Sequence, residues 1–153
     1  MSLELGLAYA GAAIALMGGL MGSSIGMGKA GMVGATALAE DPKQFRNVFL
    51  LAALPMTQTF YGLIVMIQFI SYINSAPEIT LAKALTILAL GVSTAIAEFF
   101  SAWYQGIVCS SGIAELPRTK GKITFNTMIL AVYVELIGIL GMVFALLGLS
   151  LTQ

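Results

Sequence analysis

The sequence predicts an all-α membrane protein whose four transmembrane helices form two fused helical hairpins. Of the 153 residues, 59% are hydrophobic and only 9% are charged, and the mean hydropathy is +0.97. Four long apolar stretches follow one another, each at or beyond the ~20 residues that a helix needs to cross the hydrocarbon core of a bilayer. The second half of the chain also repeats features of the first half. The first two observations place the chain in the membrane class, and the repeat predicts the two fused hairpins.

The four apolar stretches define the predicted helices. They run roughly over Leu5–Leu38, Val48–Ile73, Leu81–Ile113 and Ile123–Leu149. The first and third are too long for a hydrocarbon core of about 30 Å at 1.5 Å per residue. We therefore expect the ends of these two helices to project into water.

Basic residues gather in two of the three connections. Five of the seven lie in the loops 39–47 and 114–122, namely Lys43, Arg46, Arg118, Lys120 and Lys122. The positive-inside rule makes both loops cytoplasmic and puts both termini outside, in a multi-pass protein of the cell membrane. No Lys or Arg precedes the first apolar stretch, unlike in a cleaved signal peptide, so we expect that stretch to remain in the mature protein.

An internal repeat divides the chain into two hairpins of similar length. At a shift of 78 residues, Ser23, Gly28, Gly34 and Leu38 match Ser101, Gly106, Gly112 and Leu116. At a shift of 77 residues, Gln58 falls on Glu135. We predict a parallel duplication, with a first transmembrane hairpin over residues 1–76 and a second over 77–153 that carries an ion-binding carboxylate.

Glycines are concentrated in the first predicted helix. It holds nine of the 17, with Gly18, Gly22 and Gly26 at a four-residue spacing. Such a stripe lets helix backbones approach closely in a lipid environment. Two interpretations of the stripe remain open. One is ordinary packing inside a four-helix protein, and the other is a tight inner ring formed by the first and third helices of many copies.

One carboxylate is the most informative residue of the chain. Glu135 lies in an apolar run, and no basic residue follows Lys122 to pair with it. An acidic residue at the centre of a transmembrane helix costs about 2.5–3.5 kcal/mol, so such a residue is by default functional. The question is what Glu135 binds.

Polar residues of two other helices can reach the same depth as Glu135. In LPMTQTFYG, one helical face carries Leu54, Thr57, Gln58 and Tyr61. Pro55 cannot donate a backbone hydrogen bond, which frees main-chain oxygens nearby. The third helix adds Gln105. Taken singly, the glutamines are more often helix-to-helix hydrogen bonds and Thr57 more often bonds its own backbone, but their coincidence favours a ligand set.

The candidate ligands are all oxygen donors, which narrows the possible ions. The chain has no His, and this set has no second carboxylate, which argues against transition metals, calcium and magnesium. One negative charge with several neutral oxygens suits a monovalent cation. Sodium would neutralise Glu135, and a proton would do so with fewer ligands, so the Thr/Gln/Gln set favours sodium. The balanced charge also offers no basic patch for nucleic acid.

With these motifs in place, the sequence resembles the proteolipid rotor subunit, subunit K, of bacterial V-type sodium-translocating ATPases. LPMTQTFYG is similar to the family's LPGTQ segment with its following Tyr-Gly, and QGIVCSSG resembles its Gln-Gly motif. The resemblance covers essentially the whole chain. One departure is Met56, where the family usually has Gly, and this could alter packing beside the site.

The resemblance implies a ligand set and a set of partners. The Na+ ligands would be Leu54 through its carbonyl, Thr57, Gln58, Gln105 and Glu135, with Tyr61 donating a hydrogen bond to Glu135. The chain would form a rotor ring of identical copies in the lipid bilayer, beside a stator membrane subunit with an Arg and on central-stalk subunits. It would have no catalytic site of its own, because a soluble head would hydrolyse ATP. GMGKAG, over residues 26–31, lacks the spacing of a phosphate loop.

Three rival functions remain open from the sequence. The first is a proton-translocating rotor of the same fold, the second a stand-alone small four-helix cation transporter, and the third a membrane scaffold without transport. A further acid, Glu98, lies seven residues before Gln105 and about 10 Å toward the outside. For Glu98 we weigh a neutral acid that faces water or a ring lumen, a packing hydrogen bond, and a secondary ion contact.

Overall fold

The computed structural model describes residues 2–152, which form helices joined by short connections. In chain order the helical segments are α1 (Leu3–Glu40), η1 (Pro42–Gln44), α2 (Phe45–Ala53), η2 (Leu54–Met56), α3 (Thr57–Ser75), α4 (Leu81–Ala114), α5 (Leu116–Thr119) and α6 (Thr124–Ser150). The segments η1 and η2 are single turns of 3-10 helix. Within the described range there is no β-strand.

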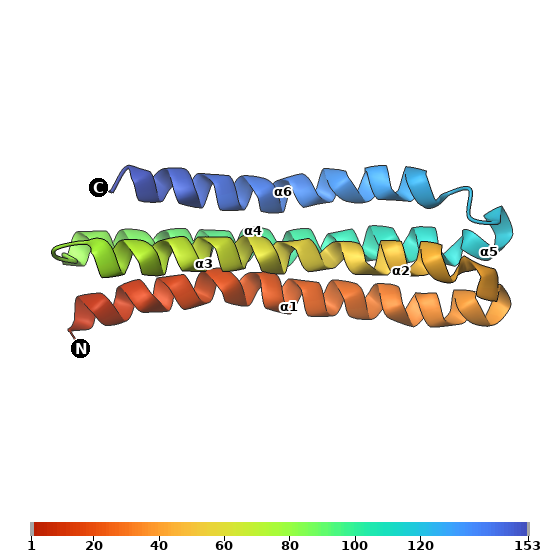
Figure 1. Cartoon of the computed structure of the whole chain (residues 1–153), viewed down its shortest axis with the longest axis horizontal. Coiled ribbons are helices and arrows are strands. Elements are labelled where there is room, and N and C mark those ends of the chain that lie inside the picture. The colour runs from red at the N-terminus through yellow and green to blue at the C-terminus, as the bar shows by residue number, and fades with distance from the viewer. Residues whose placement is uncertain (1, 153) are drawn as a thin grey trace.

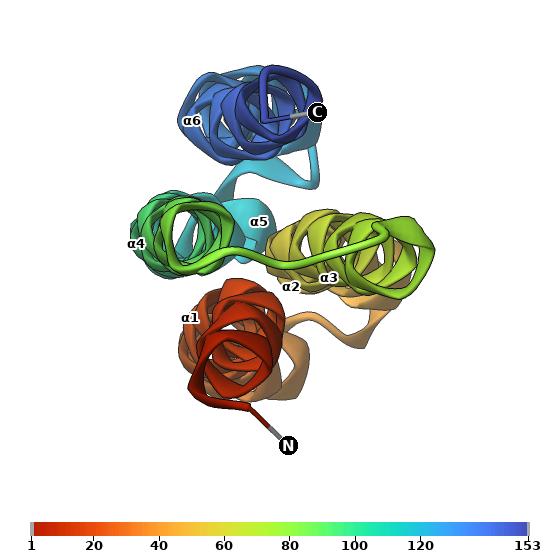
Figure 2. The ribbon, with the colours of Figure 1, turned by 90° about the vertical axis from the view of Figure 1, so that its left-hand side faces the viewer.

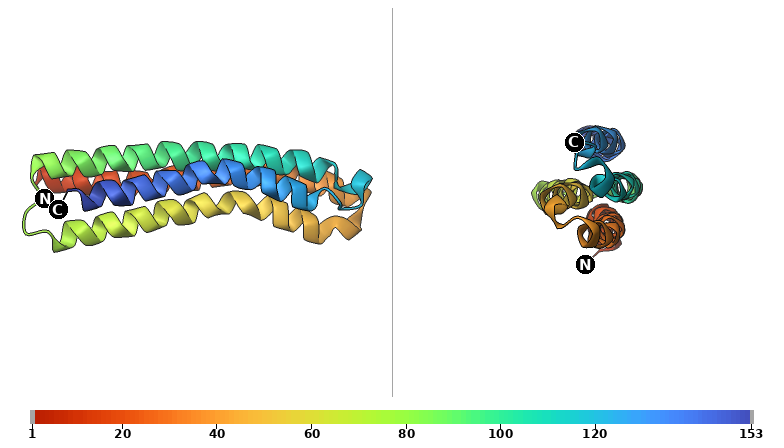
Figure 3. Two further views of the ribbon diagram at one scale, coloured as in Figure 1. Left: turned by 90° about the horizontal axis from the view of Figure 1, so that it is seen from above. Right: turned by 90° about the vertical axis from the view of Figure 1, so that its right-hand side faces the viewer.

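The long helices lie side by side in an elongated bundle, with both termini at one end (Figure 1). Seen from that end, α1 and α6 lie on opposite sides of α4, and α3 lies beside α4 and also packs against α1 and α6 (Figure 2). Viewed from above, the bundle bends gently along its length (Figure 3). Helices α1 and α4 run in the same direction (Figure 1).

Four helical segments are long and apolar enough to cross a membrane. They are Leu3–Glu40, Pro42–Ser75, Leu81–Ala114 and Thr124–Ser150. The predicted fold class is therefore confirmed, with one difference at the start of the second segment. Helical structure begins there at Pro42 instead of Val48, because Asp41 accepts a hydrogen bond from the Lys43 amide and Pro42 occupies the first turn.

The connection between α4 and α6 is more ordered than a plain loop. Residues 116–119 form the short helix α5, which then ends because the chain turns through two residues of positive φ. Lys120 has φ 52° and Gly121 has φ 80°. Glycine adopts this left-handed conformation without steric cost, which explains its place at the turn.

The two basic connections touch one another. The Asp41 carboxylate accepts a hydrogen bond of 3.1 Å from the Gln44 side chain, which in turn accepts one of 2.8 Å from Asn47. The Lys120 ammonium lies 3.9 Å from Asp41. The hydrogen bond from Gln44, supported by Lys43 and Lys120, lowers the pKa of the Asp41 carboxyl below its ordinary 3.8.

The predicted glycine stripe of α1 packs against α4 of the same chain. A Cβ at Gly22 would lie 2.8 Å from the Phe99 Cα, and a Cβ at Gly18 would overlap the backbone of Ala95. Gly11 and Gly91 face each other in the same way. The stripe thus brings α1 and α4 into backbone contact, as small residues do between membrane helices. These contacts lie within one chain, and the inner ring of the first and third helices from many copies stays a prediction.

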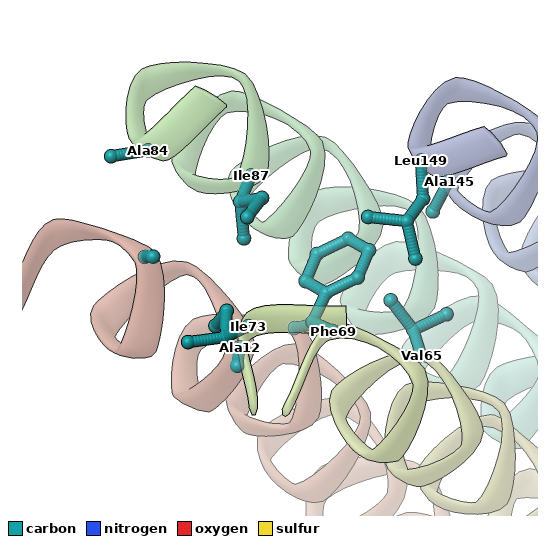
Figure 4. Close-up of a cluster of buried hydrophobic side chains, with 10 residues drawn as sticks. Ala12, Val65, Phe69, Ile73, Ala84, Ile87, Ala145 and Leu149 are labelled. Atoms are coloured by element: carbon teal, nitrogen blue, oxygen red, sulfur yellow. The ribbon is translucent and has the colours of Figure 1, made fainter. Parts of the chain in front are cut away.

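Two apolar clusters fill the ends of the bundle. The cluster near the termini consists of Ala8, Ala12, Ala15, Val65, Phe69, Ile73, Ala84, Ile87, Ala145 and Leu149 (Figure 4). The cluster near the basic connections consists of Ala30, Ala37, Val48, Leu51, Cys109, Ile113, Leu116 and Ala131. The buried polar side chains of α3, α4 and α6 lie between these two clusters.

Candidate cation-binding site

The predicted carboxylate lies inside the bundle and is hydrogen-bonded. The Glu135 side chain projects from α6, and the residue is 8% exposed. The Tyr61 hydroxyl donates to its Oε1 at 2.7 Å, and the Gln105 amide donates to its Oε2 at 3.2 Å. The two salt bridges among residues 2–152 lie in the connections, so neither neutralises this carboxylate.

The two predicted glutamines connect α3 to α4 and α6. Both are fully buried, and the Gln58 amide donates to Gln105 Oε1 at 3.0 Å. The Gln105 amide also lies 3.3 Å from the carbonyl of Ala131. The Gln58 amide also donates to the Ser101 hydroxyl oxygen at 2.9 Å. The glutamines therefore bond helix to helix and reach Glu135 at the same time.

The polar face of the second helix begins where its regular hydrogen bonding is interrupted. Pro55 cannot donate to the carbonyl of Leu51, and the chain tightens into the 3-10 turn η2 over Leu54–Met56. The Thr57 hydroxyl lies 3.1 Å from the Leu54 carbonyl oxygen and 3.2 Å from Gln58 Oε1, and it can donate its proton to either. Three oxygens thus stand close together beside the glutamine pair.

All the sequence-predicted site residues therefore occur in one connected network. Its donors and acceptors are the Leu54 carbonyl, the Thr57 hydroxyl, the side chains of Gln58 and Gln105, the Tyr61 hydroxyl and the Glu135 carboxylate. Among residues 2–152, no group of three or more His, Cys, Asp or Glu could hold a metal ion. The network has one formal charge and several neutral oxygens, which is the chemistry of a site for a monovalent cation.

Sequence reasoning missed Ser101 as a member of this network. Its hydroxyl accepts from Gln58 and donates to the carbonyl of Val134 at 2.9 Å. The signal that could have found it is its position four residues before Gln105, on the same face of α4. Ser101 ties α3 to α6 at the edge of the site.

Glu98 differs from two of the three expectations. It is 0% exposed, so it does not face water, and neither of its carboxylate oxygens has a hydrogen-bond partner within residues 2–152. The reason is its position on α4, which turns the side chain toward α6 at Gly138 instead of outward. Met56, at the position of the departure from the family pattern, is 42% exposed.

A bundle of four membrane-spanning helices with one carboxylate held at mid-length by amides and hydroxyls defines a class, the proteolipids that carry ions in rotary ATPases. The family model that describes the C subunit of ATP synthase matches residues 10–69 and again 88–148. The chain belongs to this family.

Two relatives place the chain more closely. The V-type sodium ATPase subunit K of Enterococcus hirae is 32% identical over 127 residues, which cover 83% of this chain and 80% of the relative. The A-type ATP synthase subunit K of Methanocaldococcus jannaschii is 32% identical over 145 residues, which cover 95% of this chain but 61% of the relative. The chain is thus a rotor subunit of the V/A-type ATPases and a non-catalytic component of the complex. This excludes the stand-alone transporter and the scaffold.

Proposed function

We propose that this rotor subunit binds and carries Na+ across the membrane at Glu135 as an ATP-driven ring turns. The other ligands are the Leu54 carbonyl, Thr57, Gln58 and Gln105, and Tyr61 is the hydrogen-bond partner of Glu135. The observation that carries the proposal is the single network that joins these groups around one carboxylate.

The single negative charge of the site supports the binding of a monovalent ion. An unpaired carboxylate between two apolar clusters is costly in a low dielectric, and one Na+ makes the site neutral. A divalent ion would leave an excess positive charge in the same place. The site therefore favours one singly charged ion for each chain.

The spacing of the oxygens supports sodium over a proton. Oxygens bound to a cation at ~2.3–2.6 Å are about 3.3–3.7 Å apart when they subtend a right angle. The Thr57 hydroxyl stands 3.1 Å and 3.2 Å from its two oxygen neighbours, so small outward shifts would admit an ion. A proton needs one oxygen acceptor and would not use the other oxygens of this arrangement as ligands. The name of the Enterococcus hirae relative, a sodium ATPase subunit, points the same way.

In this proposal identical copies form the ring, and ion exchange occurs where a copy meets the stator membrane subunit. An Arg of the stator competes with Na+ for Glu135 and opens the site to aqueous paths. Central-stalk subunits transmit the rotation from a soluble head that hydrolyses ATP. Moving one charge against 100 mV costs ~2.3 kcal/mol, which ATP hydrolysis supplies.

We further propose that the chain consists of two duplicated hairpins, 1–76 and 77–153, with both termini outside and the connections 39–47 and 114–122 cytoplasmic. The family model matches once in each half. Equivalent glycines also pack alike, because a Cβ at Gly34 would meet Val48 and a Cβ at Gly112 would meet Thr127. The basic residues of the two connections support the orientation.

Carbodiimide modification of the purified ring tests the ion. The reagent attacks protonated carboxyls, and bound Na+ keeps Glu135 ionised, so we expect rising Na+ at fixed pH to slow the modification of Glu135. Glu135→Gln should abolish that adduct, and Glu98→Gln should leave both the adduct and its protection in place. An Na+-insensitive reaction at Glu135 would establish the proton-translocating alternative.

Direct binding of radiolabelled Na+ gives the second test. We expect one Na+ per chain in the wild type and none in Glu135→Gln. Gln105→Ala removes a donor to the carboxylate and should weaken binding while the ring stays assembled on a native gel. Retention of Na+ by Glu135→Gln would contradict the assignment of the anionic ligand.

A further inference from the structure

The proposed transport of Na+ uses Glu135 and gives no role to the other buried acid, Glu98. Glu98 belongs to a row of polar residues on one face of α4, together with Thr94, Ser101 and Gln105, and all four are at most 2% exposed. The row runs from the cation site toward the end of the bundle that carries the termini. Glu98 occupies it one helical turn beyond Ser101, which is itself part of the cation network.

Helix α6 makes room for the Glu98 carboxyl through Gly138. A Cβ at Gly138 would lie 2.6 Å from Glu98 Oε2, whereas a Cβ at Gly141 would meet the Cβ of Ala97 at 2.5 Å. The same Cβ at Gly138 would be 3.1 Å from the Ser101 hydroxyl. The acid thus fills a notch in α6 that any side chain at position 138 would close.

The notch lies deeper in the bundle than the apolar cluster near the termini. On α4 that cluster contains Ala84 and Ile87, which precede Glu98, and on α6 it contains Leu149, which follows Gly138 (Figure 4). Neither carboxylate oxygen has a hydrogen-bond partner among residues 2–152. The carboxyl is therefore buried and unpaired within the described residues.

No charged group in the packed elements neutralises Glu98. Helix α6 contributes another acid, Glu135, and α3 contributes the Tyr61 phenol. Helix α1 contributes glycines at this level, and its one lysine, Lys29, lies over the Trp103 ring. The lysine of α4, Lys83, lies over the Tyr72 ring at the end of the bundle. An ionised Glu98 would have no counter-ion of its own, which a low-dielectric interior does not support.

The oxygens near Glu98 determine which kind of cation can neutralise it, and they are few. The Ser101 hydroxyl already bonds Gln58 and the carbonyl of Val134, and the Thr94 hydroxyl donates to the carbonyl of Leu90. A metal ion would lack ligands there, whereas a proton needs a single oxygen. We propose that Glu98 is a second cation-binding position of each chain and that it holds a resident proton.

This assignment gives the two buried acids of each chain different cations. Glu135 exchanges Na+, which rests on the proposed function, whereas Glu98, which is buried and has no counter-ion, stays protonated throughout the cycle. Each chain then carries one ion per passage past the stator although it holds two acids in the membrane. The proton at Glu98 itself does not depend on the choice of Na+ at Glu135.

Infrared spectroscopy of the purified ring tests the proton directly. At pH 8 exposed carboxyls are ionised, so the C=O stretch of a protonated carboxyl reports buried acids alone. In the Glu135→Gln background we expect one such band, shifted by deuterium exchange, and its loss in Glu135→Gln/Glu98→Gln. Glu78→Gln, which removes an exposed acid, is the matched control and should keep the band. A Glu135→Gln ring without the band overturns the proposal.

Sodium binding distinguishes the resident proton from a second metal ion or a bare charge. With a neutral Glu98, wild type and Glu98→Gln should each bind one Na+ per chain with dissociation constants within about threefold, because neutral acid and amide carry the same charge. Two Na+ in the wild type, or more than about tenfold weaker binding in Glu98→Gln, overturns it. If the wild type binds no Na+ at all, the proposed function fails while the infrared result still decides the proton.

Discussion

At the level of single residues, the Glu135 carboxylate is oriented by two donors from different helices. Tyr61 approaches from α3 and Gln105 from α4, one to each carboxylate oxygen. Hydrogen bonds to a charged acceptor are stronger than those between neutral groups. The carboxylate is therefore fixed in place before an ion arrives, and each donor contributes separately to that order.

Replacement of Tyr61 by Phe tests this contribution. The change removes the hydroxyl that donates to Glu135 at 2.7 Å and keeps the ring. A hydrogen bond to a charged group is worth about 1.5–3 kcal/mol, so Na+ binding should weaken at least about tenfold. Isothermal titration of the purified ring measures the loss. Unchanged affinity would show that the tyrosine does not order the carboxylate.

The sequence located the residues of the network but not all of its bonds. Glu135, Gln58 and Gln105 were predictable because a polar side chain within an apolar run needs a reason. Ser101 was not, because a serine in a glycine- and alanine-rich helix also serves as a small packing residue. The burial of Glu98 depends on which face of α4 meets α6, and helical spacing alone does not determine the partner of a face.

At the level of helices, the contact between α1 and α4 depends on the absence of side chains. Gly18 and Gly22 lie against the backbone of α4, whereas a Cβ added at Gly28 would have no neighbouring atom within 4 Å. The glycines of one helix therefore differ in role. The sequence showed their spacing, and only the packing shows which of them are needed.

Alanine substitution separates the two kinds of glycine. Gly18→Ala would push its methyl group into the Ala95 backbone and should destabilise the chain by about 1–3 kcal/mol. Gly28→Ala has open space and should be neutral or stabilising by up to about 1 kcal/mol through helix propensity. Thermal unfolding of the two variants in one detergent provides the comparison. Equal transition temperatures would refute the role assigned to Gly18.

The start of the second membrane segment depends on Asp41, which caps η1 and accepts the bond from Gln44. Its pKa is lowered in the folded chain, so its contribution is complete above the ordinary value of 3.8 and is lost as pH falls through the folded pKa. Asp41→Ala, which removes both acceptor oxygens of the side chain, should reproduce the acid effect at neutral pH. We expect faster amide hydrogen exchange at Lys43 and Gln44 with Na+ binding unchanged. Protection equal to that of the wild type would contradict the cap.

At the level of the whole molecule, the polar layer lies between two apolar clusters, and the basic connections lie at the end away from the termini. The four spans were predictable because length and hydropathy determine them. The order of the helices in cross-section was not, since it depends on which faces pack together. The orientation in the membrane follows from the positions of Lys and Arg and remains a prediction.

Cysteine labelling tests that orientation in whole cells. In a Cys109→Ala background, an impermeant maleimide should label Glu78→Cys in intact cells and label Lys122→Cys only after permeabilisation. Both positions are exposed in the chain, so access depends on the side of the membrane. The reverse pattern would place the termini in the cytoplasm.

The polar network also determines how many ions a rotor built from this chain moves in one revolution. In the proposed duplication Gln58 of α3 and Glu135 of α6 hold matching positions, and of these two only Glu135 is a carboxylate. A ring that carries Na+ as proposed would therefore move one ion for every four helices, half as many as if each hairpin carried its own acid. Under that proposal each ion would receive a larger share of the free energy of ATP hydrolysis, which favours pumping against a steep gradient.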